Sequence, residues 1–311
     1  MFSNRVGGGG DLRRRQRTRS QPILRDERGV RSDWGGACRG GADSGGGGSV
    51  PAGARSVSRL RANVAQATSS PWIDSNAWRF QRGLKKVNYE KLPTGSALLA
   101  AAEAFAFGAD AILNPDPADV QELSKLLRFL KSVDQPQLPA MANIGVVDDK
   151  SPAMDEVLNM LTRRNLLYRV VAAPDRKLDL TVQLGTKDFP RESAQNPSDF
   201  AARVRAKLDD DRRLVRLYGT STTIAQLTGD GKRARLHLLS YTVGGRGGRG
   251  AAGGGQSIRV RLLGRYRPVK FAGFGAANDA MLADVEDLGK TTEFSVPAFQ
   301  TYAIIDLEAM K

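Results

Sequence analysis

Apolar positions in the middle of the chain recur with a helical period and are separated by short apolar runs. The stretch "TGSALLAAAEAFAFGADAILN" predicts an apolar helix over about 96–107, capped by Thr94 or Ser96 and ended by Gly108, with a short buried strand "DAILN" behind it. The next stretch, "NPDPADVQELSKLLRFLKSV", predicts a second helix with Asp116 as its N-cap. Helix, strand and helix at this spacing indicate an α/β layer or barrel.

A second α/β pattern follows after the linker "DQPQLPA". The uninterrupted apolar run "ANIGVV" is typical of a parallel strand that is covered on both faces. Ser151 and Pro152 predict the start of a helix, and "YRVVAA" predicts the next strand, so this is a βαβ unit. We expect three more elements: a strand in "LDLTVQLG", a helix capped by Asn196 and a closing strand in "RRLVRLYG".

From Ser221 the hydrophobic period changes to two. The stretch "TTIAQLTGDGKRARLHLLSYT" predicts a β-hairpin around Gly229-Asp230-Gly231. Four more short strands are predicted, in "QSIRVRLLG", "RPVKFAGFG", "TEFSVPA" and "TYAIIDLE". Five or six short antiparallel strands predict a small β-sandwich.

Charge is distributed unevenly along the 311 residues, whose net charge is +14. The first 63 residues hold thirteen arginines, five acids and no lysine, with long glycine runs and few apolar residues. Such a segment is expected to be disordered. Three interpretations are open: a misread or mistranslated start, a passive tail, and an arm that binds nucleic acid, which we consider the least favoured.

The chemistry of the chain is limited by one cysteine, Cys38, and one histidine, His237. These counts exclude a disulfide framework, a zinc site built on Cys/His clusters, and the usual Cys–His or Ser–His–Asp catalysis. We expect no cofactor and no metal, so any catalysis would depend on carboxylates. No apolar run approaches the length of a membrane span, and no secretory signal is visible. The location is therefore open: the bacterial cytoplasm, or secretion if the true N-terminus is missing.

The order of these parts resembles the C-terminal half of bacterial beta-galactosidase-like glycoside hydrolases. "IGVVDDKSPAMDEVLNMLTRRNLLYRVV" and "LDLTVQLG" are similar to their flavodoxin-like domain, which is related to class I glutamine amidotransferases. "LVRLYGTSTTIAQLTGDGKRARLHLLSYT" and "YAIIDLE" are similar to their terminal sandwich, and "SSPWIDSNAWRFQRG" and "AAAEAFAFGADAIL" to the last turns of their TIM barrel. The resemblance implies an α/β plus all-β chain in four parts: a disordered basic arm (1–70), a barrel remnant (71–134), a flavodoxin-like domain (139–219) and a β-sandwich (220–311).

The resemblance implies a fragment of a carbohydrate-active protein with weak or no activity of its own. An active amidotransferase domain needs a cysteine and a histidine that this sequence does not have there, and most of the paired carboxylates of a glycosidase would lie in barrel sequence that is absent. The alternatives are a non-catalytic binding module that forms homo-oligomers and, less favoured, a nucleic-acid binder.

The candidate sugar site is "WIDSNAWR", residues 72–79. Trp72 and Trp78 could stack on pyranose rings, and Asp74, Asn76 and Arg79 could bind hydroxyls at the carboxyl end of a barrel strand. The competing interpretation makes both tryptophans core anchors and the polar residues a turn.

Four further features have a structural and a functional interpretation. Asp148 and Asp149 follow a parallel strand, where they could hold a ligand or a cation, or simply cap the next helix. Glu103, with Asp110 nearby, is expected in a buried structural pair rather than as a catalytic carboxylate. His237 is expected to be structural or exposed, and "GGRGGRGAAGGGQ" (244–256) to be a flexible hairpin loop rather than an RNA-binding segment.

Overall fold

The computed structural model describes residues 75–134, 136–241 and 258–310. It also describes four short strand backbones, which are β1 (Ile23–Arg25), β2 (Arg31–Asp33), β3 (Leu60–Arg61) and β4 (Trp72–Ile73). The rest of the arm predicted at 1–70, Asp74 and the glycine-rich segment 244–256 lie outside the described residues.

The first unit is an α/β layer in which two parallel strands are joined through a helix. Its elements are α1 (Ala77–Arg82), β5 (Lys86–Tyr89), α2 (Ala97–Ala106), β6 (Asp110–Leu113), η1 (Pro117–Asp119) and α3 (Val120–Ser132). β5 and β6 pair in parallel, and β6 also pairs in parallel with β1. Nine of the ten residues of α2 are buried, as the apolar pattern predicts.

The second unit contains a three-stranded parallel sheet with β7 in the middle. Its elements are β7 (Ile144–Val147), α4 (Pro152–Arg163), β8 (Tyr168–Val171), β9 (Leu180–Gln183), η2 (Arg191–Gln195), α5 (Pro197–Leu208) and η3 (Asp210–Arg212). Ser151 and Asn196 cap α4 and α5 with a proline at the start of each helix, as predicted.

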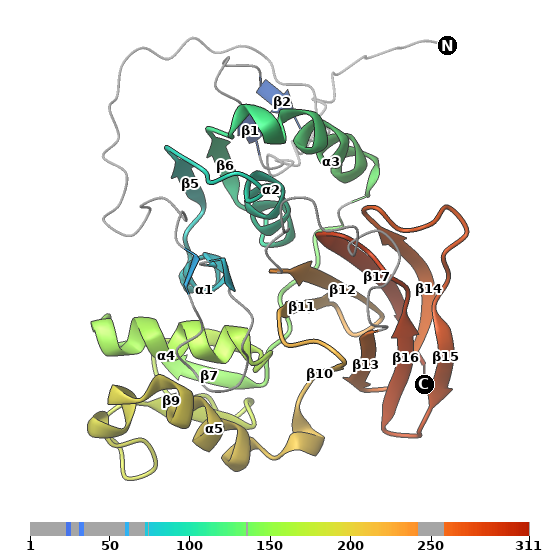
Figure 1. Ribbon diagram of the computed structural model, residues 1–311. Helices are drawn as coiled ribbons and strands as arrows, with labels where there is room; N and C mark the ends of the chain where they lie inside the picture. Colours follow the sequence, from blue (N-terminus) through green and yellow to red (C-terminus); the bar gives the residue numbers. More distant parts are fainter. Residues whose placement is uncertain are drawn as a thin grey trace, which may run out of the picture.

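The third unit is a sandwich of two four-stranded antiparallel sheets, so the chain mixes helical α/β layers with antiparallel β-structure (Figure 1). One sheet has the order β11-β12-β17-β14 and the other β10-β13-β16-β15. The strands are β10 (Val215–Tyr218), β11 (Thr223–Gly229), β12 (Arg233–Ser240), β13 (Ile258–Leu263), β14 (Tyr266–Gly273), β15 (Ala283–Asp287), β16 (Thr291–Val296) and β17 (Tyr302–Ala309).

Two expectations for this region are corrected. The strand predicted to close the second unit is β10, which instead pairs antiparallel with β13 of the sandwich. β10 and β15 bring the sandwich to eight strands among the described residues rather than five or six. β15 was not predicted, and all five of its residues are exposed.

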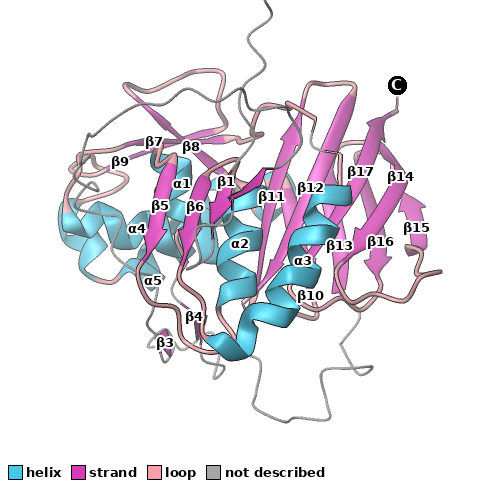
Figure 2. Ribbon diagram, turned by 90° about the horizontal axis from the view of Figure 1, so that it is seen from above, coloured by secondary structure: helices cyan, strands magenta, loops and turns pink. Residues whose placement is uncertain are grey.

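The sheet that contains β12 is covered on both faces. Between the two sheets lie Leu236, Leu238 and Phe294, which are fully buried. On the opposite face, Leu239 and Ile304 pack into one core with α2 and α3, and Figure 2 shows these helices lying against the sheet. This packing explains why β12 is buried at nearly every position and why α2 is apolar all round.

Candidate functional site

Glu103 accepts three hydrogen bonds in the interior of the first unit. Its Oε1 accepts from Ser75 Oγ at 2.6 Å, from the backbone N–H of Ala77 at 2.8 Å and from the hydroxyl of Tyr241. Ser75 and Tyr241 are themselves hydrogen-bonded at 3.0 Å. Glu103 thus joins α2 to the start of α1 and to the end of β12, and the expected structural role agrees with this geometry. Its partners are two hydroxyls and a backbone N–H rather than Asp110.

Burial raises the pKa of the Glu103 carboxyl, although the hydrogen bonds from Ser75 and Tyr241 oppose the shift. Burial and the neighbouring Glu103 raise the pKa of Tyr89 and Tyr241 as well. The cluster is enclosed, since Glu103 is 1% exposed and Tyr89 and Tyr241 are fully buried. No substrate can reach this carboxylate without opening the core.

We expect Glu103→Gln to change how stability depends on pH. A folded carboxyl with a raised pKa contributes stability that is present below the ordinary pKa of 4.5 and is lost as the pH rises through the folded pKa. Each tenfold rise in the proton affinity of the carboxyl corresponds to about 1.4 kcal/mol of this stability. Urea unfolding of the wild type and of Glu103→Gln from pH 4 to pH 8 should show this loss of stability only in the wild type.

The difference between the two stability curves, rather than either curve alone, reports Glu103. The buried His237 has a lowered pKa and also makes stability depend on pH in this range, but it does so equally in both proteins. Parallel curves for the wild type and Glu103→Gln would contradict the assignment of a raised carboxyl pKa.

The described part of "WIDSNAWR" forms a packed corner between the first and second units. Trp78 is 6% exposed and belongs to the core of the second unit with Leu158 and Tyr168, whereas Phe80 belongs to the core of the first. The guanidinium of Arg79 lies 4.3 Å from the centre of a Trp78 ring. Arg79 and Arg82 therefore lie over the indole ring, where a sugar would have to stack.

Asn76 is fully buried and fixes the start of α1. Its Nδ2 donates to the hydroxyl of Tyr89 at 3.0 Å, and its Oδ1 accepts from Arg79 at 2.7 Å. Only the backbone of Trp72 is described, and Asp74 lies outside the described residues. The structure thus brings Asn76, Trp78 and Arg79 together in an arrangement typical of packing.

The stretch also lies at a different end of the sheet from the one expected. α1 leads directly into the amino end of β5, and β4 belongs to a separate two-stranded sheet with β3. Figure 1 shows α1 between β5 and α4, away from the end where the β5 arrow points. The expectation of a position at the carboxyl end of a barrel strand is therefore corrected.

Asp148 and Asp149, at the carboxyl end of β7, are engaged by basic side chains and by the next turn. Arg82 of α1 donates two hydrogen bonds, of 2.7 and 2.8 Å, to Asp148 and a third, of 2.7 Å, to Asp155. Burial opposes ionisation of Asp148, but hydrogen bonds from Arg82 and Lys150 outweigh it and lower its pKa to about 2. Asp149 accepts from the N–H of Ser151 at 3.0 Å and pairs with Arg191.

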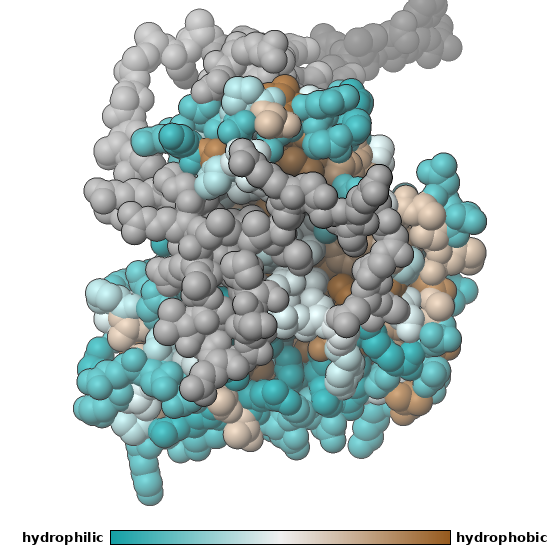
Figure 3. Space-filling view, in the orientation of Figure 1, coloured by the Kyte–Doolittle hydropathy of each residue, from teal (hydrophilic) through white to brown (hydrophobic). Residues whose placement is uncertain are grey.

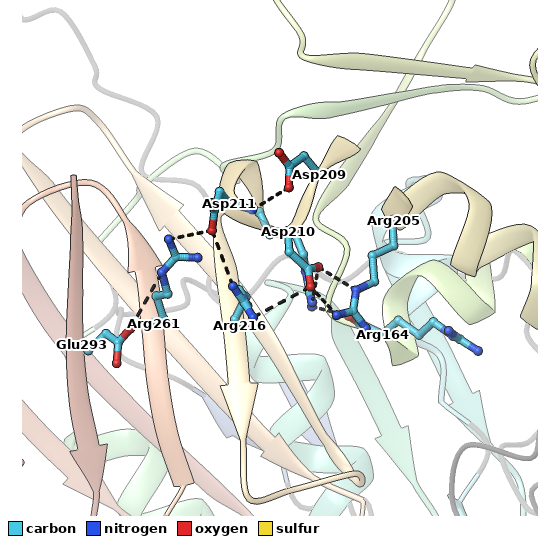
Figure 4. Close-up of polar contacts among 9 residues, drawn as sticks. Arg164, Arg205, Asp209, Asp210, Asp211, Arg216, Arg261 and Glu293 are labelled. Carbon is cyan, nitrogen blue, oxygen red and sulfur yellow. Dashed lines mark hydrogen bonds and ion pairs between the residues drawn. The ribbon is translucent and has the colours of Figure 1, made fainter. Parts of the chain in front are cut away.

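A second ion-pair network joins the second unit to the sandwich (Figure 4). Asp210 accepts from Arg205 of α5, and that hydrogen bond lowers the pKa of Asp210 to about 2. Asp211 contacts Arg216 of β10 at 3.8 Å and Arg261 of β13 at 3.2 Å. β10 lies at the edge of the sandwich sheet because all four of its residues pair with β13 and Val215 is fully buried in the sandwich core.

His237 is buried and structural. Its Nδ1 lies 2.7 Å from the hydroxyl of Tyr302, and burial lowers its pKa to about 3, so the ring is neutral near pH 7.

The carboxyl ends of β5 and β6 bring together polar residues, of which the sequence pattern singled out only Thr94 and Asp116, as helix caps. Glu90 follows β5 and is exposed, and Asn114 follows β6 and donates from Nδ2 to the carbonyl of Glu90 at 2.8 Å. Asp116 is half-buried and accepts from Thr94 at 2.8 Å, while Asp119 accepts from the N–H of Gly95. Their position directly after two parallel strands was the available signal, but the strand β5 itself was not recognised.

The described residues contain no group of three or more His, Cys, Asp or Glu side chains that could hold a metal ion. Within the same part of the chain, no helix is both long and apolar enough to cross a membrane.

Comparison with known proteins finds similarity to this chain in fold but not in sequence. No protein-family model matches it, and no curated protein sequence matches it. Among solved structures, it is similar to alpha-L-fucosidase isoenzyme 2 from Paenibacillus thiaminolyticus, with a TM-score of 0.54 and 10% identity over 73% of this chain and 60% of the fucosidase. A beta-galactosidase from Rahnella sp. R3 matches with a TM-score of 0.40 and 10% identity, over 74% of this chain and 57% of the other.

The fold of the described residues is therefore similar to that of a glycoside hydrolase. The chain spans about three fifths of the length of the structures it matches.

Proposed function

We propose that the chain is a carbohydrate-active, glycoside-hydrolase-like protein with weak or no hydrolytic activity of its own. The observation that carries the proposal is the arrangement of the described units, two α/β units and an antiparallel sandwich, in a fold similar to that of a fucosidase. Within the proposal, β5, α2, β6 and α3 are the last part of a TIM barrel. The second unit is a flavodoxin-like domain related to class I glutamine amidotransferases and is catalytically silent.

Weak catalysis is proposed because three carboxylates at prominent positions already have partners. Glu103 is enclosed by hydroxyls, Asp148 is held by Arg82, and Asp119 accepts from Gly95. Glycoside hydrolysis needs one carboxyl as a proton donor and a second as a nucleophile or base, both facing the sugar. These three cannot serve in those roles without losing bonds that hold the fold.

For sugar binding we propose the surface formed by Glu90, Asn114 and Asp116 at the carboxyl ends of β5 and β6. In (β/α) barrels, ligands bind at this end of the strands. Carboxylate and amide groups there can exchange hydrogen bonds with hydroxyls. Of residues 72–79, we assign Asn76, Trp78 and Arg79 to packing, because they contact one another at the amino end of β5. Sugar contacts by Trp72 and Asp74 stay predictions.

The test is binding and hydrolysis of a panel of oligosaccharides by the full chain, measured by calorimetry and by release of reducing ends. We expect saturable binding of one sugar class, little hydrolysis, and a dissociation constant raised about tenfold by Glu90→Ala, equivalent to about 1.4 kcal/mol. Glu192→Ala, which removes another exposed glutamate, from η2, is the control and should bind normally. Absence of binding across the panel would overturn the proposal, and rapid hydrolysis would overturn its catalytic part.

A further inference from the structure

Exposed apolar side chains gather along one margin of the sandwich. Six large apolar side chains are exposed among the described residues, and four of them lie between β14 and the turn after β15. These four form what we call the sandwich edge: Val269 (56% exposed), Met281 (79%), Val285 (49%) and Leu288 (54%). In Figure 3 the right-hand margin of the molecule carries tan and brown residues among teal ones. This margin is therefore the candidate interaction surface among the described residues.

The sandwich edge is built on the two outermost strands. β14 is the last strand of one sheet and pairs only with β17, and β15 is the last strand of the other and pairs only with β16. Figures 1 and 2 both show β14 and β15 at the outer margin of the molecule. Both strands have an irregular register, between Pro268 and Lys270 in β14 and between Ala283 and Glu286 in β15. Bulges and an edge proline disfavour the addition of another strand, so a partner must dock through side chains.

The charges beside the sandwich edge differ in sign between its two strands. The exposed charged residues of β14 are Arg267 and Lys270, whereas β15 exposes Asp284, Glu286 and Asp287. Three of these charges also have a partner in the same chain, in the pairs Arg267–Glu308, Arg259–Glu286 and Arg265–Asp287. In a two-fold symmetric contact, a residue of one copy meets a different residue of its partner, and the reverse contact occurs as well. Turning one copy so that its β14 faces the β15 of the other therefore places basic against acidic residues twice, around a shared apolar centre.

We propose that the sandwich edge is the contact through which two copies of this chain form a symmetric dimer. The apolar side chains Val269, Met281 and Val285 supply the buried centre, and the opposite charges of β14 and β15 fix the orientation. The surface is complementary to itself in both charge and apolar character, which is why the occupant is a second copy. This inference does not depend on the proposed function.

The experiment measures the mass of the full chain in solution by light scattering and by sedimentation over a range of concentrations. We expect a monomer–dimer equilibrium, and for Met281→Ser with Val285→Ser a dissociation constant at least about tenfold higher, as for truncation of central contact residues. The matched control is Ile112→Ser, which removes an exposed isoleucine from the first unit and should leave the dimer unchanged.

Charge reversal tests the orientation. Lys270→Glu alone should weaken the dimer at low salt, and adding Glu286→Lys to the same chain should restore it, because the exchanged charges meet again across the two-fold axis. Arg259, which contacts Glu286 at 3.1 Å, keeps Glu293 at 3.0 Å as a partner in this variant. A monomer at every concentration would overturn the proposal. A dimer that is insensitive to the sandwich-edge variants, or one weakened by Ile112→Ser, would also overturn it.

Discussion

Trp78→Ala should lower the free energy of unfolding by about 3–5 kcal/mol, the cost of replacing a buried aromatic side chain with alanine. Trp78 enters the core of the second unit from α1, which lies outside that unit in sequence. Its loss would leave a cavity beside Leu158 and Tyr168 and remove the ring on which Arg79 lies. Urea unfolding followed by circular dichroism would measure the change.

The same variant separates the two interpretations of "WIDSNAWR". If Trp78 is a packing residue, stability falls and any oligosaccharide binding by the remaining folded protein is unchanged. Tyr218→Ala is the matched control, because this aromatic residue is 39% exposed on β10 and its loss should cost less than about 1 kcal/mol. Unchanged stability together with lost sugar binding would instead identify the stretch as the sugar site.

Arg82→Ala should lower the free energy of unfolding by about 3 kcal/mol, the lower end of the range for removing one partner of a buried ion pair. The side chain of Asp148 is only 1% exposed, and two of its hydrogen bonds come from Arg82. Without them, a buried carboxylate keeps only the contacts with Lys150. Thermal and urea unfolding at pH 7 would measure the loss.

The effect of Arg82→Ala should disappear in acid. The depressed pKa of Asp148 means that its contribution is present above the ordinary pKa of 3.8 and is lost as the pH falls towards about 2. Arg169→Ala is the control, because it breaks a pair with Asp175 in which both side chains are about a third or more exposed, and it should cost less than about 1 kcal/mol. Equal losses in the two variants would show that Arg82 is no more than a surface charge.

The sequence predicted the elements that are either buried on all sides or packed on one side only, because their apolar pattern is then simple. α2 is buried on all sides and is apolar nearly throughout. The β11–β12 hairpin turns at Gly231 and Lys232, within one residue of the predicted Gly229-Asp230-Gly231. β5 was not recognised because it is four residues long and begins with an exposed lysine. β15 was not recognised because none of its residues is buried, and β10 was misplaced because its partner β13 is distant in sequence.

The role of the candidate site was harder to predict, because it depends on which units of the fold contact one another. Two tryptophans with polar neighbours suit a sugar site and a packed corner equally well. The deciding contacts of Trp78 and Asn76 come from α4, β8 and Tyr89, and none of these pairings can be inferred from local spacing. For Glu103, by contrast, the apolar character of its own helix was sufficient to predict a buried and satisfied carboxylate.

The sheet that is covered on both faces also decides how this chain could be divided or recombined. A cut before residue 220, which sequence patterns suggest as a natural boundary, would strip α2 and α3 from Leu239, Tyr302 and Ile304. The resulting fragment would expose the apolar face of this sheet to water. It would then aggregate or bind another protein through that face. A unit that folds when it is moved into another protein must therefore contain the sandwich together with α2 and α3, although more than eighty residues separate α3 from the sandwich along the chain.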